Sequence, residues 1–265
     1  MEEKIVIYLK TDAEIDQMRP AGELAGELLD MIEAHVKPGV TTLELNDIVH
    51  SFTTKRGAIS APLNYRGYPK SMCTSINDVV CHGIPSAKAK LKEGDIINID
   101  VTPIVNGYHG DSSRTFFVGS VSEKARKLVE VTEESLKRGI AEVKEGARVG
   151  DIGHAIQSYA EGLGYSVVRD FVGHGIGKVF HEDPQIFHYG DKGRGQRLEV
   201  GMVFTIEPMI NEGNYRTKVL KDGWTALTID GSLSAQFEHT LAIRSDWTVE
   251  VLTLSPRQKN GGLKA

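Results

Sequence analysis

The sequence predicts an α+β fold built from two similar halves of helices and antiparallel sheet, arranged around a pseudo-two-fold axis. Two observations predict it. Amphipathic helical segments and short apolar strand-like segments share the chain, and several segments recur at one constant spacing. With 265 residues, of which 40% are hydrophobic, the chain is long enough to bury a well-formed core.

Two N-terminal helices are predicted from their first turns. Residues 11–14 (TDAE) have the spacing of a capping box, and apolar residues keep helical spacing until residues 37–39 (KPG) stop the helix. Residues 41–44 (TTLE) form a second capping box and start another helix. One face of this second helix carries Leu45, Ile48, Val49 and Phe52.

Strands and loops are predicted after these helices. Glycine, proline and polar residues are frequent from residue 57 to about residue 85. Residues 95–101 resemble a strand, and residues 105–108 (VNGY) provide a hairpin turn. Residues 255–265 show no periodicity, so we expect a mobile tail. The expected single domain therefore spans residues 1–254.

An internal duplication is predicted from two matches with the same offset. Features of residues 36–57 recur in residues 143–164, and residues 94–100 match residues 201–207, in each case 107 positions later. We expect halves of roughly 12–118 and 119–254. The duplication gives Asp100 and Glu207 equivalent positions at the ends of apolar strands, so a site on the axis would receive ligands from both halves.

Charge and composition exclude several classes of protein. The 31 basic and 36 acidic residues give a formal net charge of −5, which argues against a general binder of nucleic acids or anionic membranes. The N-terminus opens acidic with too short an apolar run for a secretory signal, and no segment approaches a membrane span. Two cysteines make no disulfide framework. We therefore expect a cytoplasmic protein, with Cys81 as a small buried hydrophobe.

Five residues suggest a metal site. Asp100, Asp111, Glu207 and Glu238 lie in apolar strand-like segments, where an unpaired carboxylate is costly. A single such acid is more often a surface residue, but four need counter-charge, and two divalent cations would supply it. His174 lies between glycines in a GHGIG segment, where the backbone can approach closely. A flexible loop or a phosphate cradle is the alternative, although the dinucleotide fingerprint is incomplete.

These residues belong to motifs of a known family. From about residue 15 to residue 254, the chain resembles type I methionine aminopeptidases of the pita-bread metallopeptidase group. The motifs that carry the resemblance are GYPKS (67–71), NDVVCHGIP (77–85), NIDVT (98–102), GYHGD (107–111), GHGIGKVFHE (173–182), FTIEP (204–208), DGWT (222–225) and SLSAQFEH (232–239).

The resemblance implies a site with two divalent metal ions and a water between them. It implies that Asp100 chelates one ion, that Asp111 and Glu238 bridge both, and that His174 and Glu207 complete the shell of the other. Such mixed oxygen and nitrogen ligands suit Mn, Fe(II), Co, Ni or Zn. A water between two cations loses a proton more easily, so hydroxide is available near neutral pH.

Catalytic roles are also implied by the resemblance. Glu207 would carry a proton from the water to the leaving amine. His181 would donate to the carbonyl oxygen and His82 would contact the scissile amide. On spacing alone both histidines would be ordinary surface residues, and only the motif match favours the functional interpretation. His109, His154, His188, His35 and His50 are given no role.

The implied activity is removal of the N-terminal methionine when the second residue is small. The expected partners are N-termini of nascent polypeptides and the ribosome, with no nucleic-acid specificity, no membrane and a monomeric chain. The implied methionine pocket consists of Tyr65, Tyr68, Cys73, Phe180 and Trp224, with His82 and His181. The aromatic members have core packing as their alternative interpretation. A structural Na⁺ or K⁺ is implied at Asn77, Val79 and Ser234.

Two departures and two alternatives stay open. Pro62 opens the segment before Tyr65 where bacterial relatives commonly have cysteine, and Arg66 replaces a frequent histidine, so the pocket rim differs.

A proline-specific dipeptidase or aminopeptidase would share the five ligands, but usually has an additional N-terminal domain. A non-catalytic binding module of the same fold is the other alternative. Only 31 positions separate Glu207 from Glu238, so the long insertion of type II enzymes is absent.

Overall fold

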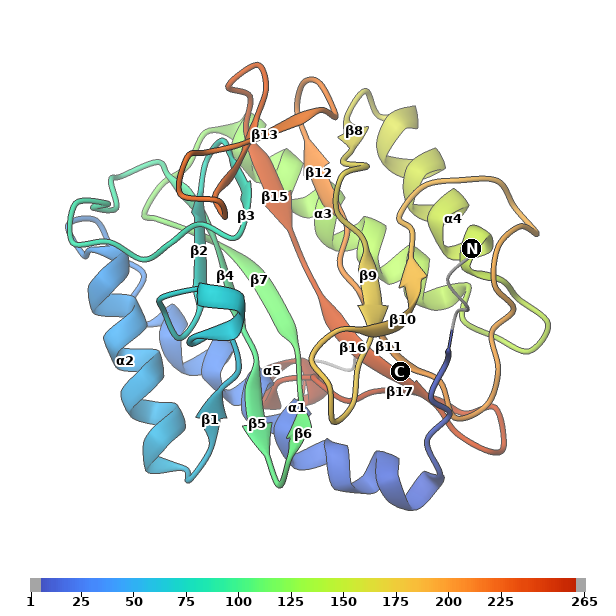
Figure 1. The fold of residues 1–265 in the computed structure, drawn as a ribbon. Helices are drawn as coiled ribbons and strands as arrows, with labels where there is room; N and C mark the ends of the chain where they lie inside the picture. The colour runs from blue at the N-terminus through green and yellow to red at the C-terminus, as the bar shows by residue number, and fades with distance from the viewer. Residues whose placement is uncertain (1–5, 261–265) are drawn as a thin grey trace.

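Helices and short antiparallel strands make up the structure, a computed structural model that describes residues 6–260 (Figure 1). All strand pairs within the described residues are antiparallel, and the α+β prediction is confirmed. No helix within residues 6–260 is long and apolar enough to cross a membrane. The helices are α1 (Asp12–Glu33), α2 (Thr42–Lys55), α3 (Glu123–Ala141), α4 (Val149–Gly162) and α5 (Pro256–Asn260), with a 3₁₀ turn η1 (Tyr65–Gly67).

The strands form five small sheets. Two sheets belong to the first half. One consists of β2 (Cys73–Ile76), β4 (Ile96–Val101) and β7 (Ser112–Phe117), and the other of β1 (Ile59–Ser60), β5 (Pro103–Val105) and β6 (Tyr108–His109). A third sheet joins the halves and consists of β3 (Val79–Cys81), β14 (Ala226–Thr228) and β13 (Thr217–Val219). The other two are β10 (Glu182–Ile186), β9 (Gly173–Gly175), β11 (Val203–Ile206), β16 (His239–Ile243) and β17 (Val249–Val251); and β15 (Ser234–Gln236), β12 (Met209–Asn211) and β8 (Ser166–Val167).

Both predicted capping boxes are present at the starts of α1 and α2. The Thr11 N–H donates to Glu14 Oε2 over 2.8 Å, and the Glu14 N–H donates to Thr11 Oγ1 over 3.3 Å. Thr41 and Glu44 make the same two bonds, of 2.7 and 3.2 Å. Each box satisfies backbone donors that a helix start leaves unpaired, so both helices begin where the sequence predicted.

The 107-residue offset reappears in the bounds of the elements. Helix α2 spans 42–55 and α4 spans 149–162, and strands β4 and β11 start at 96 and 203. One buried apolar cluster draws only on residues 24–118, and the largest draws on residues 125–254 with Ile96. Helices α1 and α2 pack against strands of the first half, and α3 and α4 pack against β8, β12 and β15 (Figure 1). The division into halves at about residue 118 stays a prediction.

The halves meet where β7 lies beside β16. Ser113 and Glu238 form an antiparallel bridge there. Next to it, Thr240 Oγ1 accepts the Asp111 N–H over 3.1 Å and donates to the Asp111 carbonyl over 2.8 Å, while Ser112 Oγ donates to the Glu238 carbonyl over 2.7 Å. Hydroxyl groups thus replace part of a backbone ladder. They hold Asp111 and Glu238, which are distant in sequence, at adjacent positions on the seam.

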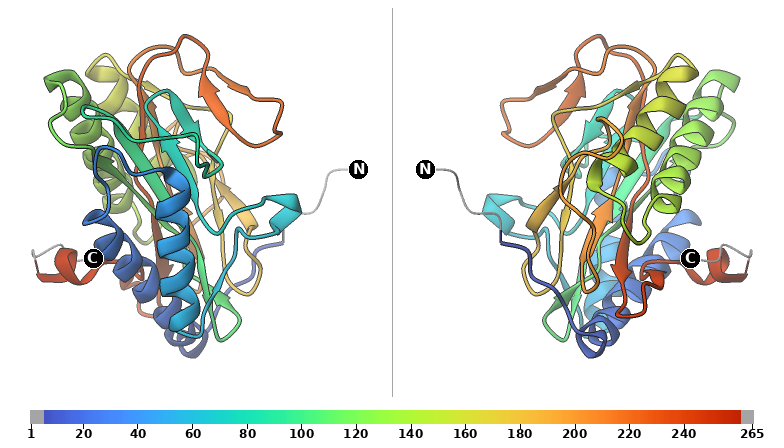
Figure 2. Two further views of the ribbon diagram at one scale, coloured as in Figure 1. Left: turned by 90° about the vertical axis from the view of Figure 1, so that its left-hand side faces the viewer. Right: turned by 90° about the vertical axis from the view of Figure 1, so that its right-hand side faces the viewer.

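Part of the expected mobile tail is helical, and its mobility stays a prediction. Residues 256–260 form α5, which lies beside α1 (Figure 2). The Arg257 N–H donates to Asp30 Oδ2 over 3.1 Å, and Lys259 pairs with Glu23 over 3.0 Å. Gly26 of α1 permits the close approach, because a Cβ there would lie 2.8 Å from the Ser255 Cα. These contacts are tertiary and leave no periodic signal. Residues 261–265 lie outside the described part.

Candidate active site

A cavity of about 370 Å³ lies where strand ends of both halves converge. All five predicted metal ligands line it, although 138 positions separate the first from the last. The cavity is also lined by His82 and His181 and by the whole predicted methionine pocket: Tyr65, Tyr68, Cys73, Phe180 and Trp224. The tertiary fold therefore brings together the residues that the sequence motifs singled out.

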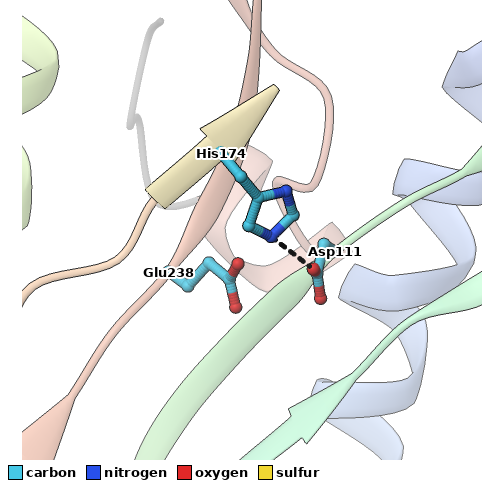
Figure 3. Close-up of side chains that lie close together, drawn as sticks. All are labelled: Asp111, His174 and Glu238. Carbon is cyan, nitrogen blue, oxygen red and sulfur yellow. Dashed lines mark ion pairs between the residues drawn. The ribbon is translucent and has the colours of Figure 1, made fainter. Parts of the chain in front are cut away.

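Three of the five predicted ligands form a tight cluster. One ligand atom each of Asp111, His174 and Glu238 lies within 4.8 Å of the other two, and all three residues are buried (Figure 3). The His174 Nε2 is 3.5 Å from Asp111 Oδ2 and 3.7 Å from Glu207 Oε1. The imidazole thus faces two carboxylates and approaches a third, which is a donor arrangement that could hold a cation.

His174 is oriented by its own strand. It lies in β9 between Gly173 and Gly175, and a Cβ at these glycines would lie 2.4 Å from the Thr205 carbonyl oxygen and 2.1 Å from that of Asp183. Only glycine lets β9 fit between β10 and β11. The His174 Nδ1 is 2.9 Å from the Gly175 carbonyl oxygen. Because a carbonyl only accepts, we assign the proton to Nδ1, which leaves the Nε2 lone pair free for a metal.

Glu207 follows β11 and is held at both ends. Its N–H donates to His188 Nε2 over 3.0 Å. Its carboxylate accepts from Thr205 Oγ1 over 2.8 Å and from Gln236 Nε2 over 3.3 Å. Burial raises the pKa of Glu207 to about 7, against the lowering effect of the neighbouring His174. In the metal-free protein this carboxyl group therefore exchanges protons near neutral pH.

The donor set fits divalent cations. Burial, and then the neighbouring acids, raise the pKa values of Asp100 and Glu238 well above their usual range. Among the ion pairs within residues 6–260, none joins Asp100, Asp111, Glu207 or Glu238 to a lysine or arginine. Four carboxylates and an imidazole nitrogen are thus gathered without the counter-charge that protein groups could supply. Divalent metal ions with mixed oxygen and nitrogen ligands match this set.

The predicted pocket residues form an aromatic wall beside the acids. Tyr68 meets Trp224 edge to face with ring centroids 5.1 Å apart, and Tyr65 packs on Phe180 at 4.9 Å. Cys73 is buried and lies opposite Asp100 in the β2–β4 register. Pro62 and Arg66 also line the cavity, so the two departures are placed at the site. Cys81 is buried, as expected, and is outside the lining.

The two candidate catalytic histidines, His82 and His181, contact different neighbours. The His181 ring is 4.2 Å from that of His174 between centroids, and its Nδ1 is 2.9 Å from the Tyr65 hydroxyl. His82 has a positive φ of 57° and meets Trp224 edge to face at 6.2 Å. Burial lowers the pKa of His82, and it lowers the pKa of His181 to about 3, which favours the neutral imidazole in both. Both rings can therefore take part in hydrogen bonds to a substrate without carrying charge.

The residues predicted to hold a monovalent cation lie outside the cavity lining. The Ser234 N–H donates to the Asn77 carbonyl over 2.8 Å, which brings these two residues together. The Asn77 side chain donates a hydrogen bond to Asp95 through Nδ2 and accepts one from the Ile96 N–H through Oδ1. The Ser234 Oγ is buried, and the described residues give it no hydrogen-bond partner. An unpaired buried hydroxyl oxygen would be available to a cation.

Several supporting residues escaped the sequence analysis. Thr102 Oγ1 donates to Asp111 Oδ1 over 2.7 Å, and Thr205 and Gln236 donate to Glu207. One signal was available in the sequence: each lies two residues from a predicted ligand in a strand-like segment, where alternation would place both side chains on the same side. His188, which supports the Glu207 backbone, and His109, whose ring stacks on Phe180 at 5.4 Å, were given no role. His109 lies two residues before Asp111 and so carries the same signal, whereas no local pattern identifies His188.

Known proteins are similar to this chain in sequence and in fold. Metallopeptidase family M24 matches residues 16–245. Methionine aminopeptidase A of Synechocystis is 64% identical over 94% of this chain and 98% of its own length. The crystal structure of methionine aminopeptidase from Rickettsia prowazekii is 56% identical, with a TM-score of 0.92, and covers 94% of this chain and 100% of that chain.

The proline-specific alternative is less similar. An Xaa-Pro dipeptidase from Bacillus anthracis is 26% identical with a TM-score of 0.75, and the match covers 94% of this chain but only 62% of that chain. Similarity to methionine aminopeptidases is thus greater in identity, in fold and in length covered. The chain belongs to metallopeptidase family M24 and, within it, to the methionine aminopeptidases.

Proposed function

We propose that this chain removes N-terminal methionine from polypeptides through two divalent cations bound by Asp100, Asp111, His174, Glu207 and Glu238. The observation that carries the proposal is the set of four carboxylates that share one cavity with an imidazole and have no lysine or arginine partner within residues 6–260. Two divalent cations would balance the four negative charges. Mn, Fe(II), Co, Ni and Zn all suit these ligands.

The arrangement supports a division of the ligands. The His174 Nε2 lies near both Asp111 and Glu207, so these three could share one ion. Asp100 lies on β4, which pairs with β7, and would hold the other ion. Asp111 and Glu238 would then bind both ions. Bound divalent cations would supply a water of lowered pKa and polarise the scissile carbonyl.

Glu207 is suited to carry the proton. Its carboxylate is held by Thr205 and Gln236 in the cavity where the cations and the water would bind. A carboxylate placed there could accept a proton from the water and return it to the leaving amine. The carboxylate is oriented by neutral donors, so neither of them competes for that proton.

Two histidines would bind the scissile peptide. His181 Nδ1 is engaged with the Tyr65 hydroxyl, so its Nε2 is left for the substrate. If the hydroxyl donates to Nδ1, Nε2 carries the hydrogen and can donate to the carbonyl oxygen as its negative charge develops. His82, on the other side of the cavity beside Trp224, would contact the scissile amide.

Methionine recognition would come from the aromatic wall. Tyr65, Tyr68, Phe180 and Trp224 present ring faces and edges, and Cys73 adds a buried thiol. Contacts between a thioether sulfur and an aromatic ring contribute about 0.3–1.5 kcal/mol each. Several such contacts would distinguish methionine from leucine, which has a similar volume but no sulfur.

The substrates would be newly made polypeptides in the cytoplasm, met at or near the ribosome by a monomeric chain. Members of the matched family are named for action on methionine, and a second residue larger than alanine or serine would meet the walls formed by His82 and His181. A Na⁺ or K⁺ at Asn77, Val79 and Ser234 would serve a structural purpose, supported by the unpaired Ser234 Oγ.

The test combines metal removal with three peptides. Protein dialysed against a chelator should be inactive and should regain activity on Met-Ala-Ser when Mn²⁺ or Co²⁺ is restored. Met-Lys-Ser and Ala-Pro should be cleaved far more slowly by the restored enzyme. Full turnover in protein shown to be free of metal would exclude the mechanism, and preferred cleavage of Ala-Pro would favour a proline-specific peptidase.

A further inference from the structure

The loop between β9 and β10, residues 176–181, carries two of the proposed functional residues. Phe180 and His181 both line the cavity. Ile176 and Gly177 at its start are buried, whereas Lys178, Val179 and His181 are exposed. The part of the loop after Gly177 therefore needs further contacts if Phe180 and His181 are to keep their places. The inference below rests on the proposed function, because the role of His181 is itself a proposal.

The carboxylate of Glu182, at the start of β10, connects this loop to the N-terminal segment. Its Oε2 is 2.5 Å from the Nζ of Lys10, and the two side chains are only 6% and 9% exposed. Its Oε1 accepts the Val179 N–H over 3.3 Å. One carboxylate thus bonds a residue 172 positions earlier in the chain and the backbone of the loop.

Lys10 is itself held in place by the sheet of the second half. Its N–H donates to the Gly201 carbonyl over 2.7 Å, in the turn before β11, and Ile7 forms a parallel bridge with Asp183. The N-terminal segment therefore passes β10 on its way to α1 (Figure 1). A Cβ at Gly177 would lie 2.8 Å from Lys10 Cε, so glycine leaves the room that this ion pair occupies.

The other side of the loop rests on β6. The Gly177 carbonyl accepts the His109 N–H over 3.0 Å and also lies 2.9 Å from His109 Nδ1. The His109 ring stacks on Phe180 with an interplanar angle of 16°. Together, β6 on one side and the pair of Lys10 and Glu182 on the other enclose the loop.

We propose that Lys10 and Glu182 are positioning residues, whose buried ion pair holds the loop so that Phe180 and His181 face the substrate. The N-terminal segment is then part of the active site, although none of residues 6–11 lines the cavity. A pair so little exposed has few water molecules to replace a lost partner, so removal of one charge leaves the other uncompensated. The loop would move to expose it, and His181 would leave its position.

The experiment compares Lys10→Met, Glu182→Gln and the double variant in the metal-loaded enzyme. The control is Lys259→Met, which breaks the exposed pair with Glu23. For Met-Ala-Ser, kcat should fall by up to about a hundredfold in Lys10→Met, because small displacements near reacting atoms are that costly. The value of KM, the metal content and the control should change little. Hydrogen exchange should accelerate at residues 176–182.

The double variant separates positioning from misfolding. It contains no unpaired buried charge, so it should melt near the wild-type temperature even if a single variant does not. Its kcat should be no lower than that of the worse single variant, because both changes break one pair. Wild-type kcat together with wild-type exchange at residues 176–182 in the double variant would overturn the inference.

His181→Ala distinguishes failure of this inference from failure of the proposed function. If His181 acts on the substrate and Lys10 positions it, Lys10→Met should lower kcat little further in the His181→Ala background. Full kcat in His181→Ala, with faster loop exchange in Lys10→Met, would refute the role of His181 and leave the positioning of the loop intact. Impaired His181→Ala beside an unaffected Lys10→Met would refute the positioning alone.

Discussion

The two halves place an acid at the same point of a central strand but surround it differently. Asp100 and Glu207 are equivalent by the offset of 107 residues. Two residues earlier, the first half has Asn98, whose Nδ2 donates to the Gln236 carbonyl over 2.9 Å and so braces the seam between the halves. The second half has Thr205, whose hydroxyl donates to Glu207 itself over 2.8 Å.

The surroundings separate the chemistry of these two acids. Burial raises the pKa of Asp100 well above its usual range, and its acidic neighbours Asp111 and Glu207 raise it further. Burial also raises the pKa of Glu207, but His174 opposes the change and the result is about 7. The duplication thus supplies two carboxylates, and unequal neighbours give them different pKa values in the metal-free protein.

The largest expected effect tests this division directly. Glu207→Gln should lower kcat by about 10²–10⁴-fold, because an amide fills the same space but cannot carry the proton. Asp100→Asn should act mainly through loss of bound metal. Turnover of Met-Ala-Ser should be measured with metal content determined on the same samples. Wild-type kcat in metal-loaded Glu207→Gln would remove the distinction between the two acids.

The pH dependence of stability tests the raised pKa values. In the metal-free protein, a raised folded-state pKa means that the contribution of Glu207 to stability is complete below the unfolded value of about 4.3 and is lost as pH rises through about 7. The loss should be roughly 4 kcal/mol. Asp100 and Glu238 shift the same way.

Bound metal should reverse this trend, because its ligands must be deprotonated. The melting temperature of the metal-free protein should therefore fall between about pH 5 and about pH 8, while the difference between Mn²⁺-loaded and metal-free protein grows. A metal-free protein that becomes more stable over this range would contradict the raised pKa values.

A smaller effect is expected from the neighbour that distinguishes the second half. Thr205→Val removes a donor to Glu207 and the acceptor of the His174 N–H, which Thr205 Oγ1 binds over 2.9 Å. Supporting residues of metal ligands contribute about 10–100-fold in affinity or activity, and kcat/KM should fall by that amount. Thr205→Ser, which keeps the hydroxyl, is the matched control. Equal activities of the two variants would show that the hydroxyl is dispensable.

The smallest effect is expected at the pocket rim of the first half. Pro62→Cys introduces the residue that is common in relatives, while Tyr65, Tyr68 and Trp224 of the proposed methionine pocket are unchanged. The KM for Met-Ala-Ser should change by less than about tenfold, equivalent to 1.4 kcal/mol. The preference for methionine over leucine should remain. A complete switch of preference would show that the proline sets specificity.

The sequence allowed local structure to be predicted where the signal is local. The capping boxes at Thr11 and Thr41 were correct because both partners of each box lie three residues apart and bond whenever the helix starts there. Strand ends with an acid, as at Asp100 and Glu207, were also visible, since a carboxylate among apolar residues departs from the ordinary pattern.

The C-terminal helix and the supporting histidines show what the sequence analysis did not predict. Residues 256–260 are helical because of contacts with Glu23 and Asp30 of α1, more than 200 positions away. His109 and His188 contact the site through a stacked ring and through a backbone N–H. His109 has only a weak signal, its position two residues before Asp111, and nothing in the order of residues distinguishes His188 from a surface histidine.

By itself the sequence determined which residue types stand at the ends of which strands, and the duplication that makes Asp100 and Glu207 equivalent. Only the tertiary structure decided their different surroundings. The pKa of a carboxyl group depends on burial and on charges within a few ångströms, and those neighbours come from β7, β9, β11 and β16 together. The ion pair of Lys10 and Glu182 also depends on the tertiary structure, because a buried ion pair forms only after both segments have packed.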